Sequence, residues 1–278
     1  MTWALAALLL AGGGTQWLGP RPPVHVTRVV TLAPSLTETV LELGAGSTLV
    51  GVSRFDDAQA VAGLPRVGGF NDVAVEAVVA LKPELVVVQK SPGNQRPVET
   101  LARLGVPVLA LPLTSVADVS EAMAELGRVL GREARARELV GALEAARAEV
   151  RAQAKARGTS PRVLFAYGFA PLVVAGPGSF AHELLEDCGA KNAALEAATT
   201  YPTYSLERAV ALAPDVIVDA ADTPGGREEM KSLGPLSRAR WVKLTSLNLL
   251  HPGPALAEGL KGLCRVLFPP PMGGDAGL

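Results

Sequence analysis

The 278-residue sequence has few aromatic residues, few charges, and almost no cysteine or histidine. Aromatic residues make up 4%, charged residues make up 19%, and the formal net charge is −1. Domains that bind nucleic acid usually carry a concentrated basic face, so this charge balance argues against a nucleic-acid partner. The three histidines and two cysteines form no cluster with the spacing of metal ligands, so we expect no metal site.

The sequence also lacks the motifs of the common α/β enzymes. No G-x-G-x-x-G follows a predicted strand, no phosphate-binding loop is present, and no G-x-S-x-G occurs. Residues 176–179 (GPGS) lack the lysine of a phosphate loop, and His182 opens HELLE without the second histidine of a zinc-protease motif. We therefore expect a binding protein that needs no cofactor. An enzyme on a two-lobed α/β fold is the competing hypothesis.

One pattern occurs twice. Residues 76–87 (EAVVALKPELVV) and 207–218 (ERAVALAPDVIV) are identical at six of twelve positions and start 131 residues apart. A unit repeated once at this distance predicts two similar lobes in tandem. Two lobes form a cleft, which is a common place to hold a small molecule.

Strands and short helices alternate on both sides of a long polar segment, which predicts α/β units with mainly parallel sheets. Residues 35–38 (SLTE) and 115–118 (SVAD) have the spacing of helix-opening capping boxes. Residues 133–157 are rich in Ala, Glu and Arg with a narrow apolar stripe, which predicts one long, mostly solvated helix between the lobes.

The ends of the chain differ from its middle. Residues 2–11 (TWALAALLLA) are apolar but too short to span a membrane, so we interpret residues 1–23 as a secretory signal or leader outside the fold. A disordered leader is the alternative. In an exported chain the two cysteines would be oxidised, whereas two buried thiols are the other possibility. The tail, residues 269–278, is rich in Pro and Gly and is expected to be disordered.

Six stretches together resemble the helical-backbone, or class III, substrate-binding proteins of bacterial ABC importers. They are RVVTLAPSLTE (28–38), LVGVSRFDD (49–57), VEAVVALKPELVV (75–87), LEDCGAKN (185–192), YPTYSLERAVALAPDVIV (201–218) and LTSLNLLHPGP (244–254). Members of this family capture corrinoids, haem or ferric siderophores outside the inner membrane, and the corrinoid-binding members are the most similar. The expected organisation is a leader (1–23), an N-terminal lobe (24–116), a helical segment with the interlobe helix (117–158), a C-terminal lobe (159–268) and a tail (269–278).

The same resemblance implies specific roles for residues. It pairs Cys188 with Cys264 in a disulfide. It also places Glu76 and Glu207 on the two lobes, where each carboxylate docks onto arginines of a permease dimer in the inner membrane. Ordinary solvated helix glutamates are the alternative for these two residues. The protein itself is expected to be a periplasmic monomer.

Ring faces suit a flat macrocycle because they give a large contact area at little conformational cost. The resemblance and the positions of loops at strand ends assign a ligand-binding set, for which packing of the lobe edges is the alternative. The set is Ser35, Phe55, Phe70, Tyr167, Phe169, Tyr201, Leu247, Asn248 and His251.

The expected ligand is cobalamin or a related corrinoid. The family's corrinoid binders carry an acidic residue in place of Leu247 and an arginine in place of His251, so this segment departs from their pattern. His251 is able to donate a hydrogen bond or to ligate a metal, which leaves haem as the alternative. A ferric siderophore would favour several arginines in the cleft, and only Arg54, Arg66 and Arg96 lie in suitable loops.

Overall fold

The computed structural model describes residues 14–221, 225–244, 249 and 251–269. The chain separates into an N-terminal unit, Met1–Leu113 with Ser120–Arg135, and a C-terminal unit, Thr114–Val119 with Ala136–Leu278. It passes between these units within the helices α4 (Val116–Val129) and α5 (Glu133–Lys155). The predicted α/β fold class is confirmed, and each unit is described by itself below.

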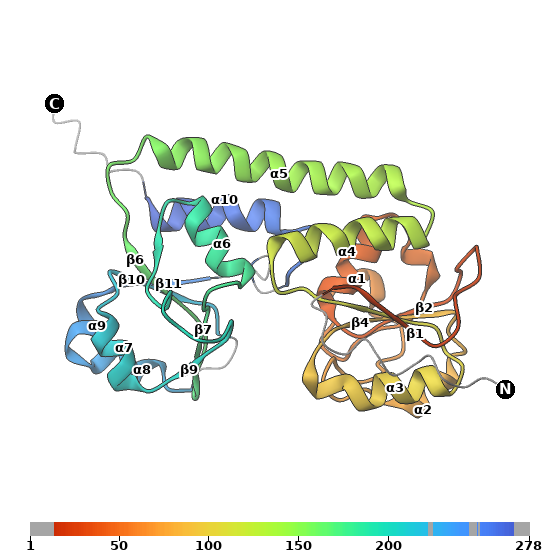
Figure 1. Ribbon diagram of the computed structural model, residues 1–278. Coiled ribbons are helices and arrows are strands. Elements are labelled where there is room, and N and C mark those ends of the chain that lie inside the picture. The colour runs from red at the N-terminus through yellow and green to blue at the C-terminus, as the bar shows by residue number, and fades with distance from the viewer. Residues whose placement is uncertain (1–13, 222–224, 245–248, 250, 270–278) are drawn as a thin grey trace. The chain divides into compact units, whose positions relative to one another are not determined.

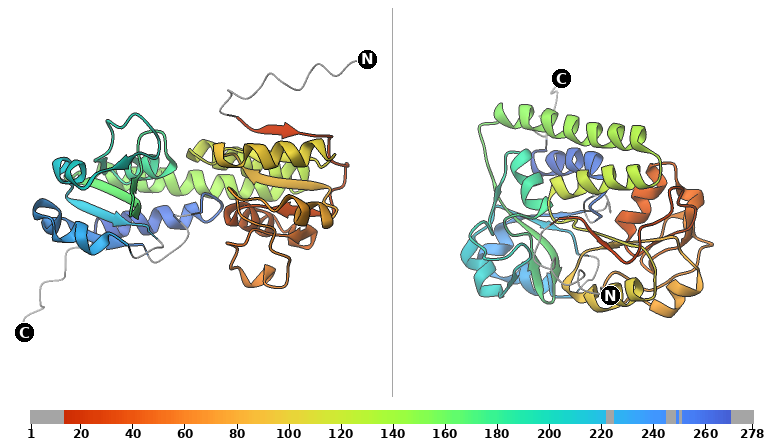
Figure 2. Two further views of the ribbon diagram at one scale, coloured as in Figure 1. Left: turned by 90° about the horizontal axis from the view of Figure 1, so that it is seen from below. Right: turned by 45° about the vertical axis from the view of Figure 1, so that its right-hand side comes forward.

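A mainly parallel sheet forms the centre of the N-terminal unit. Its strand order is β1-β5-β4-β2-β3, with β1 antiparallel to β5 and the other pairs parallel. Helices α2 and α3 cover one face of the sheet, and α1 and α4 cover the other (Figures 1 and 2). Besides α4, the elements of this unit are β1 (Gln16–Leu18), β2 (Val29–Thr31), α1 (Pro34–Glu42), η1 (Gly46–Thr48), β3 (Leu49–Gly51), η2 (Gln59–Val61), α2 (Val75–Ala80), β4 (Leu85–Gln89), η3 (Pro92–Asn94), α3 (Gln95–Arg103) and β5 (Val108–Leu111).

The central strands of this sheet are apolar along their length because helices cover both faces. All four residues of β5 (VLAL) are buried, as are the first four of β4 (LVVVQ). Residues of β2 and β4 pack against α2 and α3, and together they form a core made mainly of valines and leucines. This core holds the loops at the carboxyl ends of the strands in fixed positions.

Strand β1 corrects one expectation. Residues 1–23 were expected to lie outside the fold, but Gln16, Trp17 and Leu18 pair with Ala110, Leu109 and Val108 of β5. The indole N–H of Trp17 also donates to Glu125, at 3.1 Å. The prediction failed because β5 would otherwise be an open sheet edge, which the preceding segment fills.

The C-terminal unit has a second sheet with the strand order β11-β10-β6-β7-β9, and β8 pairs with β6. Strands β11, β10, β6 and β8 pair with one another in parallel, whereas the β6–β7 and β7–β9 pairs are antiparallel. Its elements are β6 (Arg162–Phe169), β7 (Leu172–Val174), α6 (Phe180–Asp187), β8 (Lys191–Asn192), β9 (Thr203–Tyr204), α7 (Leu206–Leu212), β10 (Val216–Asp219), α8 (Arg227–Ser232), α9 (Gly234–Arg238), β11 (Arg240–Lys243) and α10 (Leu256–Leu267).

The repeated sequence pattern forms the same helix-to-strand connection in both units. In the N-terminal unit, Arg28 precedes β2 and donates from Nη2 to the carbonyl of Leu81, at 2.6 Å, where α2 ends. In the C-terminal unit, Arg162 begins β6 and donates to the carbonyl of Leu212, at 3.1 Å, where α7 ends. Each arginine therefore binds a helix-terminal carbonyl that has no partner within its helix.

The turn that follows each of these helices is also duplicated. Lys82 and Ala213 have φ angles of 48° and 43°, and they are the residues other than glycine with a positive φ in the described part of the chain. A side chain disfavours this left-handed conformation, so both positions carry local strain. A proline follows each residue, which explains why the pattern A-L-x-P recurs in the sequence.

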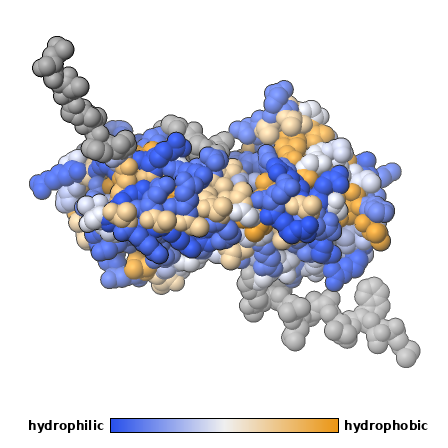
Figure 3. Space-filling view, turned by 90° about the horizontal axis from the view of Figure 1, so that it is seen from above, coloured by the Kyte–Doolittle hydropathy of each residue, from blue (hydrophilic) through white to orange (hydrophobic). Residues whose placement is uncertain are grey.

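Helix α5 carries few buried residues, as its narrow apolar stripe predicted: Ala136, Leu143, Ala146 and Val150. The rest of its surface is mainly hydrophilic (Figure 3). Ion pairs supplement this packing in the C-terminal unit. The buried carboxylate of Asp187 on α6 accepts from Nε of Arg147, at 2.6 Å, and from Nε of Arg151, at 2.5 Å.

The predicted disulfide is present. Cys188, directly after α6, is bonded to Cys264 in α10, and their Cα atoms are 5.2 Å apart. Both cysteines are buried. Together with the α5–α6 ion pairs, this bond ties three helices of the C-terminal unit to one another.

The two predicted capping boxes have different outcomes. At α4 the box is formed, because Ser115 Oγ accepts from the amide of Asp118 and the Asp118 carboxylate accepts from the amide of Ser115. At α1 the prediction was wrong: the helix begins two residues earlier, with Ala33 in place of Ser35 as its N-cap and Pro34 at its first position. Proline is favoured there because its missing N–H is not needed.

Candidate functional site

The predicted binding residues of the N-terminal unit follow the carboxyl ends of its parallel strands. Ser35 lies in the first turn of α1, just after β2, and Phe55 lies in the loop after β3. Ligands of open α/β sheets are held at this edge. The structure therefore places these two residues at the edge of the sheet where binding is expected.

Phe55 is the most accessible of the predicted aromatic rings, with 53% of its surface exposed. The Arg54 guanidinium lies 5.0 Å from the ring centroid and is held by an ion pair with Asp72. The ring also lies against Gly69, where a Cβ atom would collide with it. Phe55 thus presents a supported aromatic surface to solvent.

Ser35 and Phe70 are less accessible. Only 3% of Ser35 is exposed, and its carbonyl accepts from Thr39 Oγ1, at 2.7 Å. Phe70 is partly buried in the loop that precedes α2. Their proposed contacts with a ligand remain predictions.

In the C-terminal unit, Tyr167 and Tyr201 form an aromatic cluster with Phe165 and Phe180. Tyr201 meets Tyr167 edge-to-face, with 5.6 Å between the ring centroids, and 42% of its surface is exposed. Burial together with the nearby Asp118 carboxylate raises the pKa of Tyr201 to about 12. Both rings are therefore neutral hydrogen-bonding groups at physiological pH.

Tyr167 carries an unusual polar group. Its hydroxyl is buried and has no hydrogen-bond partner among the described residues. Burial also raises the pKa of this phenol well above its ordinary value. A buried hydroxyl without a partner costs roughly 1–3 kcal/mol, so a bound molecule or water that satisfied it would be favoured.

Phe169 lies in a different environment from the other predicted binding residues. Only 4% of it is exposed, and it belongs to the apolar core of the C-terminal unit. Its ring packs on Trp241, at 5.7 Å between centroids, and under the Arg227 guanidinium, at 5.3 Å. In this structure Phe169 is a packing residue, and its contact with a ligand stays a prediction.

The segment that departs most from the corrinoid-binding pattern is only partly described. Leu247 and Asn248 lie outside the described residues. His251 is partly buried and interacts with other groups of the protein. In the described part of the chain, no group of three or more His, Cys, Asp or Glu side chains is arranged to hold a metal ion.

The two predicted docking glutamates occupy equivalent places. Glu76 is the second residue of α2, Glu207 is the second residue of α7, and both are exposed. The carboxylate of Glu207 accepts hydrogen bonds from the Glu207 amide and from the Ser205 hydroxyl, and these bonds lower the pKa of Glu207. Carboxylates in the first turn of a helix are also favoured by the helix dipole.

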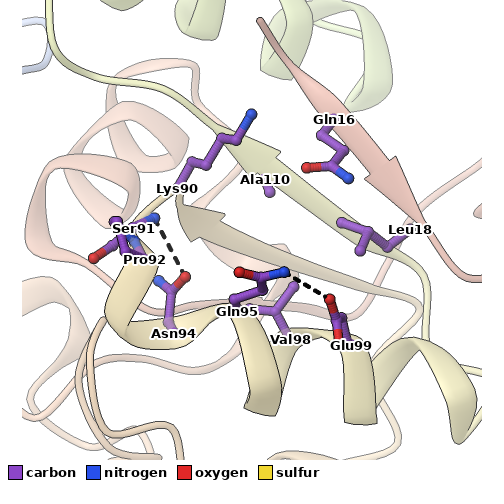
Figure 4. A pocket seen from close by; sticks show the side chains of 10 residues that line it. All are labelled: Gln16, Leu18, Lys90, Ser91, Pro92, Asn94, Gln95, Val98, Glu99 and Ala110. Atoms are coloured by element: carbon purple, nitrogen blue, oxygen red, sulfur yellow. Dashed lines mark hydrogen bonds between the residues drawn. The ribbon is translucent and has the colours of Figure 1, made fainter. Parts of the chain in front are cut away.

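The N-terminal unit contains one further hollow of interest, beside the edge strand β1. It has a volume of about 190 Å³ and is shown in Figure 4, where Gln16 and Leu18 come from β1 and Gln95, Val98 and Glu99 come from α3. Pockets for drug-sized ligands measure roughly 300–1,000 Å³. This hollow is therefore too small to hold a macrocycle.

Besides Asp187, two further buried carboxylates escaped the sequence analysis. Asp56 follows Phe55 directly and is 6% exposed, and Asp219 ends β10 and is 3% exposed. Asp219 forms ion pairs with Arg227 and with Lys243, the latter at 3.5 Å. An acidic residue at the carboxyl end of an apolar strand was the available signal for Asp219. For Asp56 the signal was an acid beside an aromatic residue in a loop after a strand.

Comparison with known proteins gives the class of the molecule. The model of the periplasmic binding protein family matches residues 29–233. The chain belongs to the periplasmic binding protein family.

Individual relatives are more specific. The chain is 30% identical over 267 residues to the vitamin B12-binding protein of Salmonella paratyphi A, which covers 95% of this chain and 96% of that protein. Among solved structures, a periplasmic haem-binding protein from Pseudomonas aeruginosa is 29% identical with a TM-score of 0.75, covering 88% of this chain and 93% of that one. The periplasmic vitamin B12-binding protein of Vibrio cholerae has a TM-score of 0.74 at 21% identity, covering 87% and 96%, and shares the fold.

These similarities confirm the expected class III binding-protein fold, and the relatives are named for binding rather than for catalysis. Within the described ranges, no helix combines the length and the apolar character that a membrane span requires.

Proposed function

We propose that this protein captures cobalamin or a related corrinoid in the periplasm and delivers it to the permease of an ABC importer. The observation that carries this proposal is the similarity to the Salmonella vitamin B12-binding protein, which extends over nearly the whole of both chains. The protein acts by binding, with no catalytic step and no resident cofactor, and works as a monomer.

The exposed aromatic rings support a flat ligand. Phe55 in the N-terminal unit and Tyr201 in the C-terminal unit are both large rings with more than a third of their surface exposed. Burying such a ring against a ligand is favourable, by about 1.5–3 kcal/mol for a Phe side chain. The buried Tyr167 hydroxyl lies beneath Tyr201 in the same cluster and supplies a group that has no partner among the described side chains.

Haem is the second candidate. It is favoured by the 29% identity to the Pseudomonas haem-binding protein and by His251, whose imidazole is a common haem ligand. If His251 ligates the haem iron, the absorbance spectrum of the haem complex should differ between the wild type and His251→Ala. Unchanged haem spectra in that variant would argue against this role.

The ligand is tested by titrating the purified protein with cyanocobalamin, haemin and a ferric siderophore. We expect saturable one-to-one binding of cyanocobalamin, weakened roughly tenfold or more by Phe55→Ala, because burying a Phe side chain contributes about 1.5–3 kcal/mol. Leu104→Ala is the matched control, since Leu104 is also an exposed apolar side chain, at 59%. Saturable binding of haemin alone would overturn the choice of ligand.

The permease contact is tested separately with Glu76→Ala combined with Glu207→Ala. We expect this double variant to bind ligand normally but to lose uptake, because two carboxylates set the register on a two-fold symmetric partner. The control combines Glu196→Ala with Glu229→Ala, which removes two other exposed carboxylates. Normal uptake by the Glu76/Glu207 variant would refute the docking role.

A further inference from the structure

A buried polar cluster lies beneath the loop that carries Phe55. Asp56 is 6% exposed, and Thr31, Thr37 and Ser53 are fully buried. The hydroxyls of Thr31 and Thr37 are 2.7 Å apart, and the hydroxyls of Thr37 and Ser53 hydrogen-bond to the Asp56 carboxyl group. The cluster connects the loop to β2 and to the first turns of α1.

The Asp56 carboxyl group is only half satisfied. Its Oδ2 atom is buried and has no hydrogen-bond partner among the described residues. The charged groups near it give little compensation: Arg66 lowers the pKa of Asp56 less than the hydrogen bonds do, and Arg54 is paired with Asp72. Its neighbour Asp57 is exposed and brings a second negative charge.

The environment of Asp56 favours the neutral form more strongly than water does. Burial is the largest influence on its pKa and raises it above the ordinary value, although hydrogen bonds from Thr37 and Ser53 oppose the shift. A buried carboxylate that lacks donors for one oxygen is costly. A protonated carboxyl group carries no charge, so protonation reduces this cost.

The same turn controls the position of the Phe55 ring. The Phe55 amide donates to Ser53 Oγ, at 3.0 Å, and the Asp56 amide donates to the Ser53 carbonyl, at 3.2 Å. The carboxyl group of Asp56 and the ring of Phe55 are therefore anchored through one serine. Movement of the buried carboxyl group toward water would pull this turn, and with it the exposed ring, away from Gly69.

We infer that Asp56 is a positioning residue for Phe55, whose neutral carboxyl group anchors the turn that presents the ring and whose ionisation loosens it. This inference rests on the proposed ligand-binding role of Phe55. Because the folded protein binds the proton more tightly than the unfolded chain does, the anchor is complete at low pH and is lost as the pH rises through the pKa of Asp56. Ligand capture therefore weakens as the pH rises through the pKa of Asp56.

The first test measures the affinity for cyanocobalamin as a function of pH in three proteins. For the wild type we expect a loss of up to about tenfold per pH unit once Asp56 ionises. Asp56→Asn keeps the shape of the side chain without the charge and is expected to give a flat profile. Asp57→Asn, at the exposed neighbouring carboxylate, is expected to follow the wild type. An Asp56→Asn profile parallel to that of the wild type would overturn the inference.

The second test needs no ligand and so separates this inference from the proposed function. Phe55→Trp places a fluorophore on the turn, and carbon NMR of the side-chain carboxyl groups follows Asp56 in the wild-type chain. We expect the Phe55→Trp fluorescence to change with the pKa that NMR assigns to Asp56, and to stay constant when Asp56→Asn is added. Fluorescence that does not change when Asp56 ionises would refute the positioning role, even if cyanocobalamin binds as proposed.

Discussion

Removing the Cys188–Cys264 disulfide should destabilise the C-terminal unit far more than the N-terminal unit. The bond joins residues 76 positions apart, both within the C-terminal unit. In the chain-entropy model a loop of this length is worth about 4.5 kcal/mol at 25 °C. Cys188→Ala with Cys264→Ala is the suitable change, because both sites are buried and alanine leaves no polar group behind.

The expected loss is large enough to measure in two ways. For a domain of roughly 150–250 residues, 1 kcal/mol corresponds to about 2–4 °C in Tm, so the C-terminal unit should melt about 10–15 °C lower. Hydrogen exchange resolves the two units: amides of β10 (Val216–Asp219) should lose protection, while amides of β4 (Leu85–Gln89) should keep theirs.

Two results would refute this reasoning. A loss below about 1 kcal/mol would show that the loop between the cysteines is already ordered in the unfolded chain, contrary to the entropy argument. An equal loss of protection in β4 and β10 would show that the two units unfold as one. Cys188→Ala alone is the control, since it also breaks the bond and should match the double variant.

Two further predictions concern single side chains. Because the pKa of Tyr201 is raised to about 12 by burial and by Asp118, stability should fall as the pH rises from about 10 to about 12. Urea unfolding of Tyr201→Phe should show a shallower fall than the wild type, since the buried Tyr167 still contributes; an identical fall in both proteins would disprove the assignment. Lys82→Gly and Ala213→Gly should each raise the free energy of unfolding by about 0.5–1 kcal/mol, because relief of the left-handed strain exceeds the added entropy of the unfolded chain. The control Ala211→Gly, inside α7, should lower it by about 1 kcal/mol, and a loss at Lys82 or Ala213 would contradict the strain argument.

The repeated architecture was predictable because local and long-range preferences agree there. In each copy a helix is followed by a proline and then by an apolar strand. A parallel strand that is buried on both faces requires such a run of apolar residues. Residues 76–87 and 207–218 therefore predicted both α2–β4 and α7–β10. The disulfide was predicted through resemblance to a family, since spacing alone left two buried thiols as an alternative.

The features that were missed depend on partners distant in sequence. Gln16–Leu18 forms a strand because β5, more than 80 positions later, offers an edge. Ser35 has the sequence signature of an N-cap, but Pro34 moves the start of α1 two residues earlier. Local propensities describe neither effect, because tertiary pairing decides the first and a fixed proline φ decides the second.

The candidate site shows the same limit. Phe55 and Tyr201 were predicted from aromatic character in loops, and both are exposed in the structure. Phe169 has the same character but is buried, because its strand continues into the core beneath Trp241. The role inferred for Asp56 was not predictable, since it depends on a missing hydrogen-bond donor, which no sequence pattern reveals.

Strand β1 has a practical consequence for handling the protein. A recombinant chain trimmed at residue 23 would lack the three residues that pair with β5. The uncovered backbone amides and carbonyls of β5 would then be available to strands of other molecules, which is a known route to aggregation. An expression plasmid that keeps Gln16 onward should yield dispersed material, whereas the shorter one should tend to precipitate.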